Sequence, residues 1–187
     1  MKYLLVFFAV LSSYLTHAQG SFGFAEATIT YKRGDSMVCL VKREVNFGEV
    51  ITYKVHQDAD ETQVGTSYIK SIRIGSTHFE SIPIGKKEKL STLIISGKTT
   101  LFTYVESQAG QTLSIPNSNG RVTPFKITVH YIAKNGDKYS QIEEDSFEKD
   151  LKKIVSDCPT ILADLDNHVY IFRQVPEVIK QYNICKN

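Results

Sequence analysis

The tripeptide Arg33-Gly34-Asp35 contains residue types that can mediate recognition at a protein surface. It is the sequence that integrins recognise, and an adhesive role requires Arg33 and Asp35 to project outward from a hairpin tip. Glycine and aspartate are also common turn residues between two strands. Because an apolar run lies on each side of the tripeptide, the sequence favours a plain turn, with adhesion as the alternative.

Two other runs combine carboxylates with a histidine: Asp164-Leu165-Asp166-Asn167-His168 and His56-Gln57-Asp58-Ala59-Asp60-Glu61. Hard cations take several oxygen ligands, and borderline cations take histidine together with carboxylate. Neither run has the turn glycine or the terminal glutamate of a calcium-binding EF-hand loop. The first run is typical of a helix-to-strand turn and the second of a solvated loop, so we predict no metal ligands.

No local motif for catalysis is present in the sequence. The chain lacks the G-x-S-x-G elbow, the H-E-x-x-H helix and a glycine-rich phosphate loop. The histidines after the leader, His56, His78, His130 and His168, are isolated from one another. We therefore predict no catalytic residue and no cofactor. A triad assembled from distant residues is recognised only by geometry, so a small secreted hydrolase stays open as an alternative.

The three cysteines differ in their surroundings. Apolar side chains and Cys158 form one helical stripe, at Phe147, Leu151, Ile154, Val155 and Cys158, and a second stripe holds Val178, Tyr182 and Cys185. Packing of the two stripes predicts a disulfide between Cys158 and Cys185, which is worth about 3 kcal/mol for a loop of this length. Two buried free thiols are the alternative. Cys39 lies in the apolar run Met37–Lys42 and is predicted to be buried and unpaired.

Residues 1–18 have the pattern of a secretory signal peptide. Lys2 precedes the apolar run Tyr3–Leu11, and small residues at Thr16 and Ala18 fit a cleavage site before Gln19. The apolar run is about half of the roughly 20 residues that a membrane-spanning helix needs. We expect an exported protein in the periplasm, at the outer-membrane periphery or outside the cell, with no transmembrane span in the mature chain.

The balance of charge excludes one class of partner. Among charged residues the leader removes Lys2 alone, which leaves 21 basic and 20 acidic side chains. Nucleic-acid binding is not expected, because it calls for a basic patch or stripe. Aromatic residues are spread through the strand region and could line a cleft or a partner surface: Tyr53, Tyr68, Phe79, Phe102, Tyr104, Phe125, Tyr131, Tyr139, Tyr170 and Phe172. Most of them are better explained as core or cross-strand pairs.

The elements that would hold these residues are mostly strands. From 27 to 142, alternating apolar runs separated by turn residues predict antiparallel hairpins around Gly75-Ser76, Gly97-Lys98 and Asn135-Gly136. The stretch 56–65 is predicted to be a loop, and 108–124 a long loop or a weak hairpin. Helices are predicted at about 145–158, with Asp145 as cap, and at 176–185. A short helical turn is expected at 160–165 and a strand at 168–172.

These patterns predict an α+β protein that is mostly β. We expect one domain over 19–187, with an antiparallel sheet or sandwich-like arrangement followed by a C-terminal helical pair.

Several short motifs resemble those of a known group of proteins. They are the Gly34-Asp35 turn, Ile69–Gly75, Ser96–Lys98 with Leu101–Tyr104, Asp157–Pro159 and Tyr182–Cys185. On these motifs the chain resembles uncharacterised exported envelope proteins of Bacteroidota-type bacteria, some of which continue into an outer-membrane β-barrel domain. The resemblance implies an envelope location and carries no catalytic residue with it.

The expected function is that of a non-catalytic secreted or envelope module, either binding or structural. Its expected partner is an envelope protein or a glycan, contacted through the sheet. A small secreted hydrolase and an accessory subunit of an outer-membrane complex are the alternatives.

Overall fold

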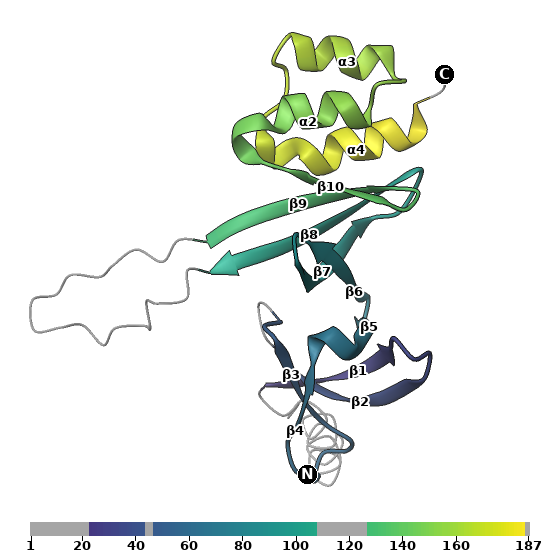
Figure 1. Ribbon diagram of the computed structural model, residues 1–187, viewed down its shortest axis with the longest axis vertical. Helices are drawn as coiled ribbons and strands as arrows, with labels where there is room; N and C mark the ends of the chain where they lie inside the picture. Colours follow the sequence, from purple (N-terminus) through teal and green to yellow (C-terminus); the bar gives the residue numbers. More distant parts are fainter. Residues whose placement is uncertain (1–22, 44–46, 108–126, 186–187) are drawn as a thin grey trace, which may run out of the picture.

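A computed structural model of the chain describes residues 23–43, 47–107 and 127–185. The predicted signal peptide and the predicted loop at 108–124 lie outside the described residues. The described part forms an antiparallel sheet of ten strands followed by helices, which confirms the predicted mostly-β α+β class. In Figure 1 the helices lie together at one end of an elongated molecule and strands β1–β4 lie at the other.

The strand order in the sheet is β10-β9-β8-β7-β6-β5-β1-β2-β3-β4. The strands are β1 Phe24–Tyr31, β2 Ser36–Lys42, β3 Val50–Lys54, β4 Thr62–Gly65, β5 Ile69–Ile74, β6 Thr77–Ile84, β7 Lys87–Ile95, β8 Thr99–Ser107, β9 Ile127–Asn135 and β10 Lys138–Ile142. The helices are α2 Phe147–Ile154, α3 Pro159–Asp166 and α4 Val175–Ile184, with 3₁₀ turns η1 Thr66–Tyr68, η2 Glu144–Ser146 and η3 Phe172–Gln174.

The three predicted hairpins are present. β5 pairs with β6, β7 with β8, and β9 with β10. Gly136 has a φ of 55°, the left-handed conformation that the turn between β9 and β10 requires. The sequence did not reveal β4, which lies inside the predicted 56–65 loop, because polar residues hide the alternation of this short edge strand.

Buried side chains form two large clusters at the two ends of the sheet. The N-terminal core consists of Ala27, Ile29, Cys39, Val41, Ile51, Ile69, Ile72 and Leu90. The helix-packed core lies between β8–β10 and the helices and includes Leu101, Tyr131, Ile142, Leu151, Leu165, Val178 and Ile179. A small third cluster of Ile82, Phe102, Tyr104 and Ile132 lies on the other face of the sheet. The sheet therefore joins two bodies, each with its own core.

The first C-terminal helix is shorter than predicted. It ends at Ile154, and its N-cap is Ser146 instead of Asp145, with the Ser146 hydroxyl donating to Asp150 Oδ2 at 2.7 Å. Cys158 is therefore not part of this helix but is the N-cap of α3. Pro159 opens α3 at a position where its missing N–H costs nothing, so the predicted short helical turn is a two-turn helix.

The predicted strand at 168–172 is wrong. His168 has a φ of 54°, which turns the chain after α3, and the segment continues into η3 without joining the sheet. Tyr170 and Phe172 still pack against the helix-packed core, while Val169 and Ile171 are exposed. The apolar run is thus partly buried, with Phe172 packed against Tyr131 and Phe147, but the segment itself forms no strand.

The predicted disulfide joins Cys158 to Cys185, the residue that follows α4. Cys39 is buried and free, as its apolar strand indicates. In the described part of the chain, no helix is long and apolar enough to cross a membrane.

Candidate ligand-binding cleft

The sheet opens between β7 and β8. The ladder that joins these two strands begins at Thr92↔Thr103. Before Thr92, β7 pairs on its other side with β6, and after Thr103, β8 pairs on its other side with β9. The two strands therefore separate between Leu90 of the N-terminal core and Leu93, which packs against the small third cluster.

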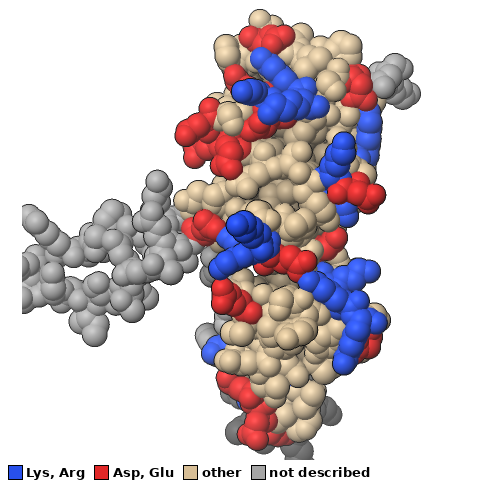
Figure 2. Space-filling model, in the orientation of Figure 1, with Lys and Arg blue, Asp and Glu red and all other residues tan. Residues whose placement is uncertain are grey.

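A cleft of about 330 Å³ occupies this opening, and we call it the β7–β8 cleft. It is lined by 87–90 and Thr92 of β7, 103–106 of β8, Phe79 of β6, the segment 47–49, and Thr66 of η1. Its volume lies at the lower end of the range that small-ligand sites occupy. Figure 2 shows basic and acidic side chains interleaved across the middle of the face it presents, between the two ends of the molecule.

One end of the cleft is apolar. The rings of Phe47 and Phe79 meet edge to face with their centroids 5.0 Å apart. Leu90, which belongs to the N-terminal core, lines the same end. This end offers a surface for an apolar group, because aromatic rings and a leucine side chain are the contacts that such a group gains by leaving water.

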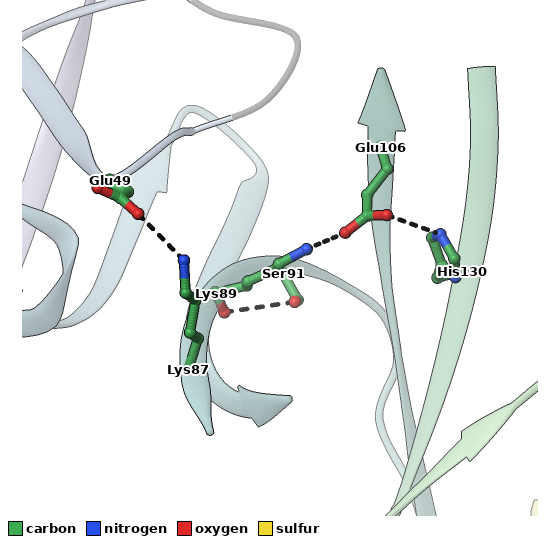
Figure 3. Close-up of polar contacts among 6 residues, drawn as sticks. All are labelled: Glu49, Lys87, Lys89, Ser91, Glu106 and His130. Carbon is green, nitrogen blue, oxygen red and sulfur yellow. Dashed lines mark hydrogen bonds and ion pairs between the residues drawn. The ribbon is translucent and has the colours of Figure 1, made fainter. Parts of the chain in front are cut away.

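The other end holds four side chains that contact one another, Lys89, Tyr104, Glu106 and His130, and Figure 3 shows Lys89, Glu106 and His130. Lys89 pairs with Glu106, and its Nζ lies over the Tyr104 ring at 4.6 Å from the centroid. The His130 ring stacks on Tyr104 with centroids 4.6 Å apart and an interplanar angle of 8°. Tyr104 and His130 face each other because they are directly paired across β8 and β9.

The electrostatics of this group follow from its contacts. The ammonium of Lys89 holds the pKa of Glu106 below its usual range, with a smaller contribution from His130. Burial, together with the nearby carboxylates of Glu106 and Glu143, raises the pKa of Tyr104 to about 12. At neutral pH Glu106 is therefore a carboxylate and Tyr104 an uncharged phenol.

His130 is mostly buried, with 17% of its side chain exposed. Its Nε2 lies 3.6 Å from Glu106 Oε2, and in the described structure this buried atom has no hydrogen-bond partner. The hydroxyl of Thr103 donates to the backbone carbonyl of His130 at 2.9 Å and does not reach the ring. Within the described residues, no hydroxyl or thiol is hydrogen bonded to this imidazole as the nucleophile of a hydrolase would be.

The other charged groups of the cleft are also paired. Lys87 Nζ lies 3.3 Å from Glu49 Oε1, across the mouth (Figure 3). Glu88 pairs with Lys32 of the β1–β2 turn and accepts a hydrogen bond from Ser81 at 3.2 Å. The lining thus presents opposite charges that neutralise one another.

The adhesion-like tripeptide lies at the β1–β2 turn, outside this cleft. Arg33 and Asp35 bind each other through two hydrogen bonds, Nε to Oδ1 at 2.5 Å and Nη2 to Oδ2 at 2.7 Å. The guanidinium also stacks over Tyr31. The structure thus gives the tripeptide the geometry of a closed turn.

The two runs of carboxylates and histidine are not assembled into sites. Asp166 pairs with Lys152, His168 with Glu148, and Asp164 accepts a hydrogen bond from Tyr170. In the run at 56–61, the histidine and its carboxylates are exposed on a turn. Among the described residues no group of three or more histidine, cysteine or acidic side chains has the arrangement of a metal site.

The residues of the cleft were not identified as a site from the sequence. Phe79 and Tyr104 appeared only among the scattered aromatics, and His130 only as an isolated histidine. The signal that could have found them is register, because His130 meets Tyr104 only if β8 and β9 pair as observed.

Comparison of the chain with family models, with curated proteins and with solved structures gives no match.

Proposed function

We propose that this protein is an exported, non-catalytic binding module that holds its ligand in the β7–β8 cleft. The observation that carries the proposal is the separation of β7 and β8 beyond the Thr92↔Thr103 pair, which opens a lined cleft between the N-terminal core and the small third cluster. Clefts between packed bodies are common positions for ligands. The absence of a hydroxyl or thiol bonded to His130 within the described part of the chain favours binding over hydrolysis.

Export is supported by the sequence of residues 1–18 and by the cysteine pair. The leader has a basic start, a short apolar run and a cleavage-site pattern. The disulfide between Cys158 and Cys185 is of a kind that persists in oxidising compartments. The resemblance to exported envelope proteins supports the same cellular location. We infer that the mature protein begins at Gln19, which mass spectrometry of secreted or periplasmic material would test.

The chain itself offers a sensitive test of binding in the cleft, because it contains no tryptophan. In a Phe79→Trp variant the single indole lies at the apolar end of the cleft. In a matched Tyr68→Trp variant it lies at a position that is 70% exposed and outside the cleft lining. Both variants are titrated with a library of short peptides and with a panel of neutral and acidic oligosaccharides.

We expect a saturable change in the emission of the Phe79→Trp protein with one of these panels, and none with the Tyr68→Trp protein. Calorimetry on the unaltered protein with the same compound guards against an effect of the substitution itself. If neither panel changes the cleft fluorophore and calorimetry is also silent, the proposal is wrong.

A further inference from the structure

We propose that the ligand of the β7–β8 cleft is an extended peptide segment of a partner protein, which adds as a strand between the facing edges of β7 and β8. This inference rests on the proposed function and names the class of ligand.

The register identifies the edges. Continuing the Thr92↔Thr103 pairing by one, two and three residues would place Ser91 opposite Tyr104, Leu90 opposite Val105 and Lys89 opposite Glu106. All of these residues are in strand conformation, yet the β7–β8 ladder of the described structure does not include them. Strand β6 pairs with the opposite edge of β7, and β9 pairs with the opposite edge of β8.

Backbone N–H and C=O groups on such facing edges are a template for another extended chain. A peptide that adds to an edge gains main-chain hydrogen bonds along its whole length, and side-chain pockets then select its sequence.

The Lys89–Glu106 pair marks the separation of the strands. Two long side chains from positions that would be directly opposite meet at their charged tips, across the opening (Figure 3). In a closed ladder these positions are about 5 Å apart, and a gap of one vacant strand doubles that spacing. The pair therefore spans the two strands on the face of the sheet that carries Tyr104.

The charge of the lining favours a peptide over an anionic ligand. Lys87, Lys89 and Glu88 each have an opposite charge as partner within the protein. A phosphate or an acidic sugar would have to displace a carboxylate from each lysine. An uncharged peptide backbone needs only hydrogen-bond donors and acceptors, which the two strand edges supply.

The two sides of the cleft predict the pattern of the peptide. Leu90 and Phe79 lie on one face of the sheet, because they pair with Ser81 and Thr92 at alternate positions of the β6–β7 ladder. Tyr104 and Lys89 lie on the opposite face. Since side chains alternate along a strand, a bound peptide has one apolar set toward Phe79 and one polar set toward Tyr104.

The length follows from the strands. The unpaired stretch covers about four positions on each side, 88–91 facing 104–107, which corresponds to about 13 Å of extended chain. A peptide of about six residues spans it with a residue to spare at each end.

The probe is therefore a library of six-residue peptides in which threonine alternates with valine, isoleucine, leucine or phenylalanine. Each is titrated into the unaltered protein by calorimetry and into the Phe79→Trp protein by fluorescence. The best binder is then synthesised in two further forms, N-methylated at the odd or at the even amides. N-methylation keeps the side chains and removes the donors, and a strand added between two edges uses both sets.

We expect the alternating peptides to bind, and each N-methylated form to bind at least tenfold more weakly. Scrambling the order so that apolar residues are adjacent should weaken binding to a similar degree. A Tyr68→Ala variant, altered outside the cleft, should bind the peptide as the unaltered protein does.

Three results would overturn the inference. If oligosaccharides alone bind, the protein is a glycan-binding module, so the proposed function holds and the peptide ligand is wrong. If the N-methylated peptides bind as well as the parent, recognition does not involve strand addition. If neither peptides nor oligosaccharides bind, both the inference and the proposed function fail.

Discussion

At the scale of single residues, Tyr104 connects the charged end of the cleft. Its ring contacts the Lys89 ammonium and stacks on the His130 imidazole. Both contacts are to the ring and not to the hydroxyl, so phenylalanine at this position should keep them. The ionisation of the phenol, by contrast, is opposed by burial and by two carboxylates.

This difference predicts a pH effect. Because the pKa of Tyr104 is raised to about 12 in the folded protein, the folded state holds this proton above pH 10 while the unfolded chain loses it. The stabilisation is complete below about pH 10 and is lost as the pH rises toward 12. At pH 11 the loss amounts to roughly 1 kcal/mol of the free energy of unfolding. Urea unfolding of the parent and of Tyr104→Phe at pH 8 and pH 11 measures it.

The Tyr104→Phe protein should lose less stability between these two pH values than the parent by that amount. A Tyr68→Phe variant, changed at an exposed tyrosine, controls for the general effect of removing a phenol. Equal losses in the parent and in Tyr104→Phe would show that Tyr104 is solvated in solution.

At this scale the sequence was a poor guide to the site. The sequence drew attention to Arg33, Asp35 and the carboxylates near His168. In the structure these residues form separate hydrogen bonds and ion pairs and are not assembled into one site. The residues of the cleft come from separate strands and are brought together by pairing. Tyr104 and His130 are separated by the predicted loop at 108–124, so no local pattern could place them face to face.

At the scale of elements, the C-terminal helices form hydrogen bonds with the sheet at the β7–β8 turn, at Lys98 and Thr99. The Asn183 side chain accepts a hydrogen bond from Thr99 N at 2.7 Å and donates one to Thr99 O at 2.8 Å. Thr99 is fully buried at the start of β8. Nearby, Asp157 accepts hydrogen bonds from Lys98 and Tyr182. The disulfide adds a covalent tie between the start of α3 and the end of α4.

The Asn183 contact predicts a large effect from a small change. Asn183→Ala would leave a buried N–H and a buried C=O of Thr99 without partners, at a cost of about 2–4 kcal/mol in the free energy of unfolding. Gly97→Ala should also lower the free energy of unfolding, because a Cβ on Gly97 would overlap the Asn183 amide and displace it from Thr99. Chemical denaturation measures both.

Gly48→Ala is the matched control, since a Cβ there meets no atom within 4 Å. A Gly97→Ala protein as stable as Gly48→Ala would mean that α4 is not seated against this turn.

The elements themselves were largely predictable, and the failures have physical causes. Turn residues and alternation located the hairpins at Gly75, Gly97 and Gly136, because those signals are local. The apolar stripes gave the right disulfide although Cys158 is the cap of α3 and not the last turn of α2. The stripe predicted correctly that the Cys158 thiol is buried. It did not predict where α2 ends, because that depends on the turn at Val155–Asp157. The prediction of a strand at 168–172 failed because an apolar run does not say whether a neighbouring strand exists.

At the scale of the whole molecule, two cores share one sheet. β7 contributes Leu90 to the N-terminal core, while Leu93 packs on the small third cluster and Ile95 on the helix-packed core. The cleft interrupts the sheet on one side of β7, but the ladder of β6 with β7 is continuous from Phe79↔Thr92 to Ile84↔Lys87. The two bodies are thus joined through the same strand whose free edge lines the cleft. This topology could not be read from the sequence, in which every strand looks equivalent.

The shared strand predicts that the two bodies unfold together. Ile72→Ala in the N-terminal core and Leu151→Ala in the helix-packed core each remove a fully buried side chain and should cost about 2–5 kcal/mol. Because β7 cannot stay ordered when either core is lost, each substitution should lower the Tm of one common transition, by roughly 5–15 °C. Hydrogen exchange measured by mass spectrometry then shows faster opening in both bodies for either variant. Should Ile72→Ala expose residues 24–74 while α2 and α4 remain protected, the bodies are independent. The cleft would then be a hinge between two units that fold separately, and a bound peptide would be the link that couples their stabilities.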